Sequence, residues 1–221
     1  MRNLPAWGAF AAGCVLLAAL PAGSAPAGDA RGRFDRALKS TRDARADFTQ
    51  TSAGPLGPVA SRGTFEYARP RRIRMTWRGA AAATAYVVAD TFWFDQPGQG
   101  AIVRGDARAV GVPAGLFVDA SLAALERTCR VAATGPLALA LTPRGSGAAW
   151  TRLTLALDPA TGWPRTVTLT TTDGTTTRLA FGAFRLNGGI AANRLAPRFA
   201  PGRVVMPWTG AAGAGSVRAG H

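Results

Sequence analysis

Histidine, cysteine and carboxylate side chains are the groups that most often move protons, attack substrates or hold metal ions. This chain of 221 residues has a single histidine, His221, which is its last residue. Its two cysteines are Cys14 and Cys129, so neither a Ser-His-Asp nor a Cys-His arrangement can be assembled around a well-placed histidine. The sequence also has no metal-ligand spacing and no phosphate-binding glycine loop. We therefore expect no enzyme, no metal site and no cofactor.

The 12 acidic residues leave one catalytic alternative open. Glu66, Asp90, Asp95, Asp158 and Asp173 fall in or beside expected strands and turns, and glycoside hydrolysis uses a pair of carboxylates. Their spacing along the chain gives such a pair no support. A hydrolase is therefore the least favoured interpretation.

The chain is strongly basic, with a formal net charge of +14 from 26 basic and 12 acidic residues. Such a charge is typical of proteins that bind nucleic acid or anionic membranes. Here Lys39 is the only lysine, the arginines are scattered, and alanine, glycine and proline are abundant, which indicates GC-rich coding bias. We expect no nucleic-acid partner and a weak attraction to anionic lipid headgroups. A basic domain that binds polyanions such as nucleic acid or lipopolysaccharide is the alternative from a different class.

Residues 1–27 have the pattern of a secretory signal peptide. A positive start is followed by an apolar run from Trp7 to Leu20 and by the small-residue pattern Ala25-Pro26-Ala27. The run is shorter than the ~20 residues of a membrane-spanning helix. No later stretch is long and apolar enough to span a membrane, so we expect no stable membrane insertion.

The two cysteines have different expected fates. Cys14 lies inside the signal, where Ala12-Gly13-Cys14 resembles the end of a lipoprotein signal, but the apolar run continues past it. We favour cleavage near Ala27 and keep a lipid anchor at Cys14 as an alternative. Cys129 is then the only cysteine of the mature chain, so it cannot form an internal disulfide. We expect it to be a small buried apolar residue.

Most of the remaining chain alternates between apolar and polar residues, which is the pattern of half-buried strands. Residues 32–44 and 119–130 are exceptions, because their apolar residues fall at helical spacing, and Asp119 or Ser121 can cap the second helix. Asp173-Gly174 marks a tight hairpin. Strands are expected within residues 46–50, 64–67, 72–78, 86–89, 91–95, 101–104, 137–141, 150–157, 165–172, 175–181 and 184–186.

These elements predict a mainly β domain over residues 28–207, followed by a Gly/Ala-rich disordered tail over residues 208–221. A sheet of about ten to eleven antiparallel strands must curl, and two amphipathic helices are available to cover its concave face. Large apolar side chains on these strands either fill an ordinary core or line a cavity, and composition does not decide between the two. They are Phe48, Phe65, Tyr67, Ile73, Met75, Trp77, Phe92 and Phe94.

The order and spacing of several short segments resemble the periplasmic lipoprotein carrier family, LolA-like, over about residues 34–205. Each segment alone is weakly specific. The matching segments are Ala46-Asp47-Phe48-Thr49-Gln50, Gly63-Thr64-Phe65-Glu66-Tyr67, Arg69-Pro70, Val87-Val88-Ala89-Asp90, Phe92-Trp93-Phe94-Asp95, Leu141-Thr142-Pro143, Leu155-Ala156-Leu157-Asp158, Asn187-Gly188-Gly189-Ile190 and Phe199-Ala200-Pro201-Gly202.

The resemblance implies an incomplete antiparallel β-barrel with a helical lid over an apolar cavity, in a monomer located in the periplasm. It implies an acylated lipoprotein cargo, received from an inner-membrane ABC transporter and passed to an outer-membrane lipoprotein receptor. By position, Arg69 would hydrogen-bond to the lid and hold it shut, while Ile73 and Met75 would face the cavity. Met75 stands where an aromatic residue is common in the family, and the charge is higher than is usual there. A carrier of a glycolipid or another amphiphile, or a receptor form anchored at Cys14, stays open.

Overall fold

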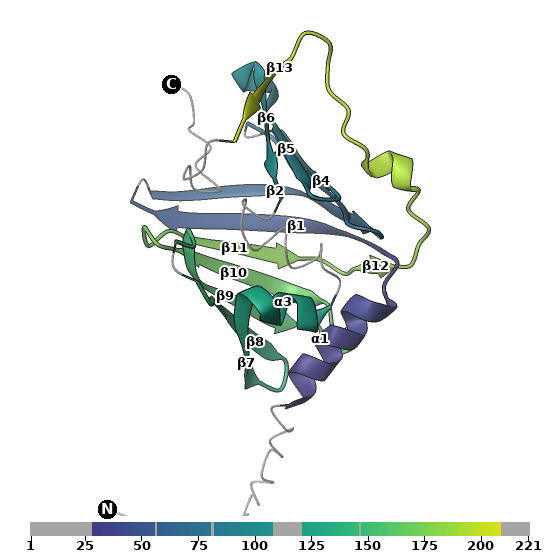
Figure 1. The fold of residues 1–221 in the computed structure, drawn as a ribbon, viewed down its shortest axis with the longest axis vertical. Helices are drawn as coiled ribbons and strands as arrows, with labels where there is room; N and C mark the ends of the chain where they lie inside the picture. The colour runs from purple at the N-terminus through teal and green to yellow at the C-terminus, as the bar shows by residue number, and fades with distance from the viewer. Residues whose placement is uncertain (1–27, 56, 81, 108–120, 146, 209–221) are drawn as a thin grey trace, which may run out of the picture.

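The computed structural model describes residues 28–55, 57–80, 82–107, 121–145 and 147–208 (Figure 1). The expected signal peptide with Cys14, and the tail from residue 209, lie outside the described residues. The N-terminal half contains α1 (Gly28–Ser40), β1 (Asp43–Gly54), β2 (Gly57–Ala68), β3 (Arg72–Arg78), β4 (Ala83–Val88), β5 (Thr91–Asp95), the 3-10 turn η1 (Pro97–Gln99) and β6 (Ala101–Asp106). The C-terminal half contains α3 (Leu122–Thr128), β7 (Cys129–Gly135), β8 (Ala138–Pro143), β9 (Trp150–Leu157), β10 (Pro164–Thr171), β11 (Thr176–Phe181), β12 (Arg185–Leu186), the 3-10 turn η2 (Ala192–Leu195) and β13 (Val204–Pro207).

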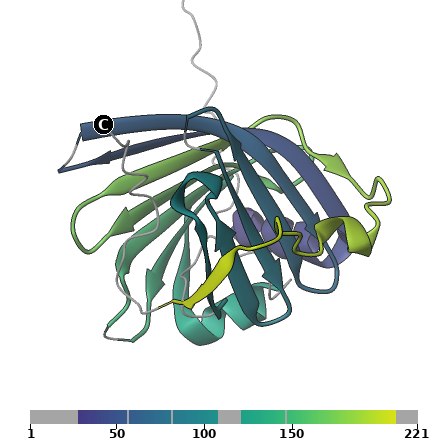
Figure 2. The same ribbon diagram turned by 90° about the horizontal axis from the view of Figure 1, so that it is seen from above.

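The strands form one open sheet of 13 strands in the order β13-β6-β5-β4-β3-β2-β1-β11-β10-β9-β8-β7, with β12 added beside β1. Its ends, β13 and β7, are not hydrogen-bonded to each other within the described residues. Figure 2 shows the resulting curl. The predicted incomplete barrel is therefore confirmed, with more strands than the ten to eleven expected. All pairs are antiparallel except β13 with β6.

Both helices pack on the inner side of the curl, where their apolar residues join a single core with the strands. In α1 the side chains of Phe34, Ala37 and Leu38 are buried, at the helical spacing that the sequence predicted. The helix ends four residues earlier than residue 44, because the hydroxyl of Thr41 donates to the carbonyl of Ala37 (2.7 Å) and the chain turns into β1.

The second helix is also shorter than expected. Ser121 caps α3 by accepting a hydrogen bond from the backbone N–H of Ala124 (3.2 Å), as one of the two predicted caps. The helix ends at Thr128, and β7 begins at Cys129, which the sequence had placed inside the helix. Cys129 is buried and forms no disulfide, as expected of a small core residue.

The chain after β12 runs as a strap over the outer side of the sheet (Figure 1). Leu195 in η2 is fully buried against this side, and the ring of Phe199 meets Tyr86 of β4 edge-on (5.9 Å between centroids). The strap then adds β13 parallel to β6. Arg203 fastens it by donating to the carboxylate of Asp95 (2.5 Å) and to the carbonyl of Ala101 (3.0 Å).

Among the residues described, no helix has the length and apolar character needed to cross a lipid bilayer.

Candidate functional site

The eight apolar residues singled out from the sequence lie on one face of the sheet. Cross-strand pairing aligns Phe65 with Met75, and Tyr67 with Ile73, so each pair shares a face. This face is the inner one, because its residues belong to the same core as the buried side of α1. The eight residues are Phe48, Phe65, Tyr67, Ile73, Met75, Trp77, Phe92 and Phe94.

Burial divides these eight residues into two groups. Five are almost completely covered by the protein itself: Phe48, Phe65, Tyr67, Ile73 and Phe92. Met75, Trp77 and Phe94 are only half-buried, although they pack against the core. These three lie on β3 and β5, away from the strands that α1 and α3 cover. Among the residues that the structure describes, β3–β5 is therefore one region where the apolar inner face is only partly covered.

The half-buried group is held together by aromatic contacts. The ring of Trp77 meets Phe48 edge-on (5.7 Å between centroids) and Phe94 at 6.2 Å. Its indole N–H donates to the side-chain oxygen of Gln50 (3.0 Å), so the polar atom of Trp77 is satisfied within the otherwise apolar face. Gly63 lies opposite both rings, and a Cβ there would come within 2.7 Å of the Phe48 ring and 2.1 Å of a backbone oxygen.

A second aromatic group, which the sequence did not single out, fills the inner face under α1. Phe181 meets Phe65 edge-on (5.6 Å), and Phe184 lies 4.9 Å from the ring of Trp163. The indole N–H of Trp163 donates to Thr41 Oγ1 at the end of α1 (2.9 Å). This part of the inner face is therefore occupied by the protein's own side chains.

Arg69 connects the turn after β2 to the C-terminal end of α1. Its guanidinium donates to the carbonyl of Leu38, one of the last carbonyls of the helix, and its backbone N–H donates to the carbonyl of Arg42 (2.8 Å). Burial raises the pKa of the nearby Tyr67 hydroxyl, and Arg69 acts in the opposite direction. The arginine therefore has the contact with α1 that a lid latch requires; its role as a latch stays a prediction.

The other part of α1 is attached to α3 and β7. Arg31 pairs with Glu126 and donates to the carbonyl of Val131 (2.8 Å). Asp35 accepts the backbone N–H of Leu122 (3.0 Å), the first residue of α3. The pKa of Asp35 is lowered, first by the hydrogen bond from Lys39, with the contact to Leu122 adding to it and burial opposing it. The two helices therefore form one cover.

The end of the strap returns to the inner face. The ring of Trp208 meets Phe92 edge-on (6.2 Å), and its backbone N–H donates to the carbonyl of Arg104 (2.7 Å). A Cβ on Gly105 would lie 2.6 Å from Trp208 Cβ, so the missing side chain makes room for the tryptophan. The sequence assigned Trp208 to the disordered tail, because neither its neighbours nor its position indicated a partner.

Two hollows open on the surface of the described residues. One, of about 650 Å³, lies over β1, β2 and β11 and is lined by Asp47, Phe48, Thr49, Arg62, Gly63, Arg78, Ala180, Phe181 and Gly182. The other, of about 590 Å³, lies at the β6–β13 edge and is lined by Asp90, Thr91, Arg104, Gly105, Asp106, Val205 and Pro207.

No three histidine, cysteine or acidic side chains gather as a metal site in the part of the chain that the structure describes.

No protein-family model matches the chain, and no curated protein matches it. Several solved structures are similar to it. An uncharacterized conserved protein from Thermus thermophilus is 12% identical with a TM-score of 0.50, over 82% of this chain and 99% of the other. A putative outer membrane lipoprotein-sorting protein domain from Vibrio parahaemolyticus is 13% identical (TM-score 0.44; 76% and 95% covered). A LolA superfamily protein from Nitrosomonas europaea is 9% identical (TM-score 0.46; 77% and 97% covered). At these identities the likeness concerns the fold alone.

Proposed function

We propose that this protein is a carrier that shelters the acyl chains of a lipid-bearing cargo against the inner face of its open sheet. The observation that carries the proposal is the half-buried group Met75, Trp77 and Phe94. These residues continue the apolar face beyond the edge of the helical cover. An apolar surface of this kind, next to a closed core, is suited to bind hydrocarbon.

The physical need for such a carrier follows from the cost of exposing an acyl chain to water. A chain with ~15 methylene groups, each worth about 0.8 kcal/mol when buried, gains about 12 kcal/mol from its membrane. Unaided escape is therefore slowed by roughly 10⁸-fold. A carrier lowers this barrier by offering an apolar surface, but it must bind weakly enough to release the chain. The helical cover is held by a few polar contacts, among them the one between Arg69 and Leu38. The strength of these contacts can set the affinity of the carrier for the acyl chain.

The finer parts of the proposal rest on the family resemblance. The cargo would be an acylated lipoprotein, the donor an inner-membrane ABC transporter, the acceptor an outer-membrane receptor, and the location the periplasm. The signal-like residues 1–27 support export. A glycolipid or another amphiphile as cargo is compatible with the same apolar face, because an apolar surface does not distinguish the methylene groups of one lipid from those of another.

The proposal is tested by recovering what the protein binds. The full chain, expressed with residues 1–27 in a Gram-negative host, is purified without detergent, extracted with organic solvent and analysed by mass spectrometry. We expect one class of acyl-bearing molecule at a near-stoichiometric amount, and its loss from a Met75→Glu variant. Protein that carries no acyl-bearing molecule, and that does not bind a fluorescent fatty acid added later, would contradict the proposal. An extracted glycolipid instead of a lipopeptide would change the cargo but not the mechanism.

A further inference from the structure

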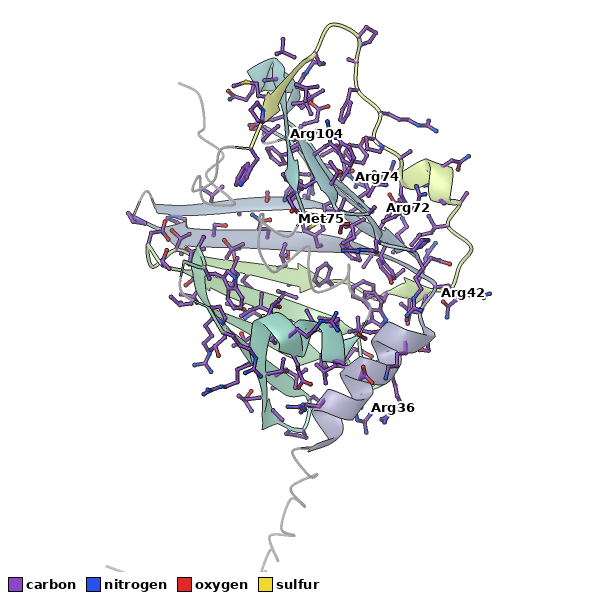
Figure 3. The ribbon with its side chains drawn as sticks, in the orientation of Figure 1. Arg36, Arg42, Arg72, Arg74, Met75 and Arg104 are labelled. Carbon is purple, nitrogen blue, oxygen red and sulfur yellow. The ribbon has the colours of Figure 1, made fainter. Side chains whose placement is uncertain are left out.

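The fold gathers arginines that are scattered in the sequence onto the outer side of the sheet. Across β12, β1, β2 and β3, pairing aligns Arg185, Arg45, Glu66 and Arg74 in one row. Arg194 of η2 reaches the same glutamate from the strap. Figure 3 shows Arg42, Arg72 and Arg74 on this same side of the molecule. The arginine cluster consists of Arg42, Arg45, Arg72, Arg74, Arg185 and Arg194.

The cluster holds more positive charge than its carboxylates can neutralise. Glu66 is almost fully buried and is contacted by Arg74 Nε (2.7 Å), by Arg194 Nε (3.2 Å) and, more distantly, by Arg45 Nη1 (3.9 Å). One negative charge therefore serves three guanidinium groups. The other carboxylate here, Asp43, accepts a hydrogen bond from the backbone N–H of Gly189 (3.1 Å).

The remaining arginines have no carboxylate partner among the residues that the structure describes. Arg42 and Arg185 are exposed, and Arg72 is half-buried with its Nε unpaired. Arg185 of β12 lies directly opposite Arg45 of the adjacent strand β1. Like charges in such a pair weaken a sheet. The excess positive charge of the cluster does not stabilise the fold. An anion bound over the cluster would reduce the repulsion between its guanidinium groups.

We propose that the arginine cluster docks the protein on a membrane surface of anionic phospholipids. Guanidinium groups bind phosphate oxygens in a fixed fork geometry. The six arginines come from the α1–β1 junction, β1, β3, β12 and η2, so they form a broad face suited to a plane of many phosphates rather than to one bound ion. The backbone contact between Arg69 and Arg42 places this face beside the attachment of α1. Docking would therefore bring the C-terminal end of α1, where the helical cover is attached, close to the membrane at which a carrier would exchange its cargo.

The test compares two double variants that remove the same charge. Arg42→Gln with Arg185→Gln removes two cluster arginines that lack carboxylate partners. Arg152→Gln with Arg178→Gln removes two exposed arginines from the outer face of β9 and β11. Strand β9 is separated from β1 by β11 and β10, and Arg178 pairs with Thr51, toward the opposite end of β1 from Arg45. Binding is measured by co-sedimentation with phosphatidylcholine vesicles containing about one third phosphatidylglycerol, at an ionic strength of about 0.1 M. Pure phosphatidylcholine vesicles serve as the blank.

We expect the cluster variant to partition about 25-fold more weakly than the wild type, since each arginine near an anionic surface contributes about fivefold. The β9/β11 variant should lose less than about threefold, and the wild type should not bind the blank vesicles. Equal losses in both variants, or no wild-type binding, would overturn the proposal. So would displacement by inorganic phosphate at constant ionic strength, which indicates a site for the free ion, or cluster-dependent binding of polyglutamate without binding of vesicles.

Docking and cargo binding are separable in this design. The cluster lies on the outer face, so the cluster variant should bind a fluorescent fatty acid as tightly as the wild type. Loss of vesicle binding with normal fatty-acid binding supports docking alone, whereas absence of fatty-acid binding in every form bears only on the carrier proposal.

Discussion

The guanidinium of Arg69 lies against the main-chain carbonyl of Leu38, so the turn between β2 and β3 is attached directly to the last turn of α1. That carbonyl is one of the few helix carbonyls without a partner inside the helix, and the arginine is well placed to satisfy it. Close by, the indole N–H of Trp163 donates to Thr41 and holds the same end of α1 from the turn between β9 and β10. One helix end thus joins the two halves of the sheet.

Replacing Arg69 with leucine tests the latch. Hydrogen bonds to a charged group contribute about 1.5–3 kcal/mol, so Arg69→Leu should favour the open form and let cargo load while hindering its release. The measurement is the rate at which a loaded carrier delivers lipid to acceptor membranes. Arg178→Leu, an exposed change on β11, is the control. Normal transfer by Arg69→Leu would show that Arg69 is not the latch.

The uncovered part of the inner face should be separable from the core by mutation. Met75→Glu puts a charge on a half-buried position, so we expect fatty-acid binding to fall at least about tenfold with a small loss of stability. Leu153→Ala, at a fully buried position on β9, should instead cost about 2–5 kcal/mol of unfolding free energy and leave binding by the folded protein largely intact. Fluorescent fatty-acid titration and urea unfolding measure the two effects. The opposite pattern would place the cargo under α1.

Gly105 should be intolerant of a side chain because of Trp208. Gly105→Ala brings the new methyl group within 2.6 Å of Trp208 Cβ, so we expect a loss of about 1–3 kcal/mol from forced repacking. Gly98→Ala is the matched control, since its Cβ would meet open space. In a Trp208→Gly background, which removes Cβ of residue 208 as well as the ring, the cost of Gly105→Ala should largely disappear. Additive costs in the double variant would mean that the two residues do not share this contact.

The contact between α1 and α3 should depend on pH. The lowered pKa of Asp35 means that its stabilising effect is present above the ordinary aspartate value of about 3.9 and is lost as the pH falls through the lower folded value. We expect Asp35→Asn to lower the melting temperature by a few degrees near pH 7, and the difference from the wild type to vanish near pH 2. Thermal unfolding followed by circular dichroism across this range gives the result. A difference that stays constant with pH would assign the effect to packing rather than to charge.

Alternation of apolar and polar residues was sufficient to predict much of the sheet and one face of it. It identified the region of β3, where Ile73, Met75 and Trp77 share a face, because period-two patterns depend only on neighbouring residues. It missed β7, since Leu122, Leu125 and Cys129 continue a helical spacing into a strand with few large apolar residues. It also gave β13 no separate strand, because all four of its residues are exposed and no alternation is present.

The site was only partly predictable for a related reason. The residues of β1–β5 could be grouped locally, but Phe181, Phe184 and Trp163 reach the same face through a register between distant segments. The cover's other contacts, such as Arg31 with Glu126, also join residues far apart in the chain. The arginines are scattered in the sequence, as described, but strand pairing brings Arg45 and Arg185 side by side. No local pattern contains that information.

The parallel strand β13 gives assembly of this fold a definite order. Ala101 of β6 pairs with Val204, so the outer neighbour of β6 arrives only after every other strand has been made. Until then β6 is a bare edge, open to pairing with another chain. Closing so long a loop is slow compared with forming hairpins. A newly made chain would therefore pass through a period in which β6 is a bare edge in addition to β7 at the other end of the sheet, and addition of the strap would cover β6.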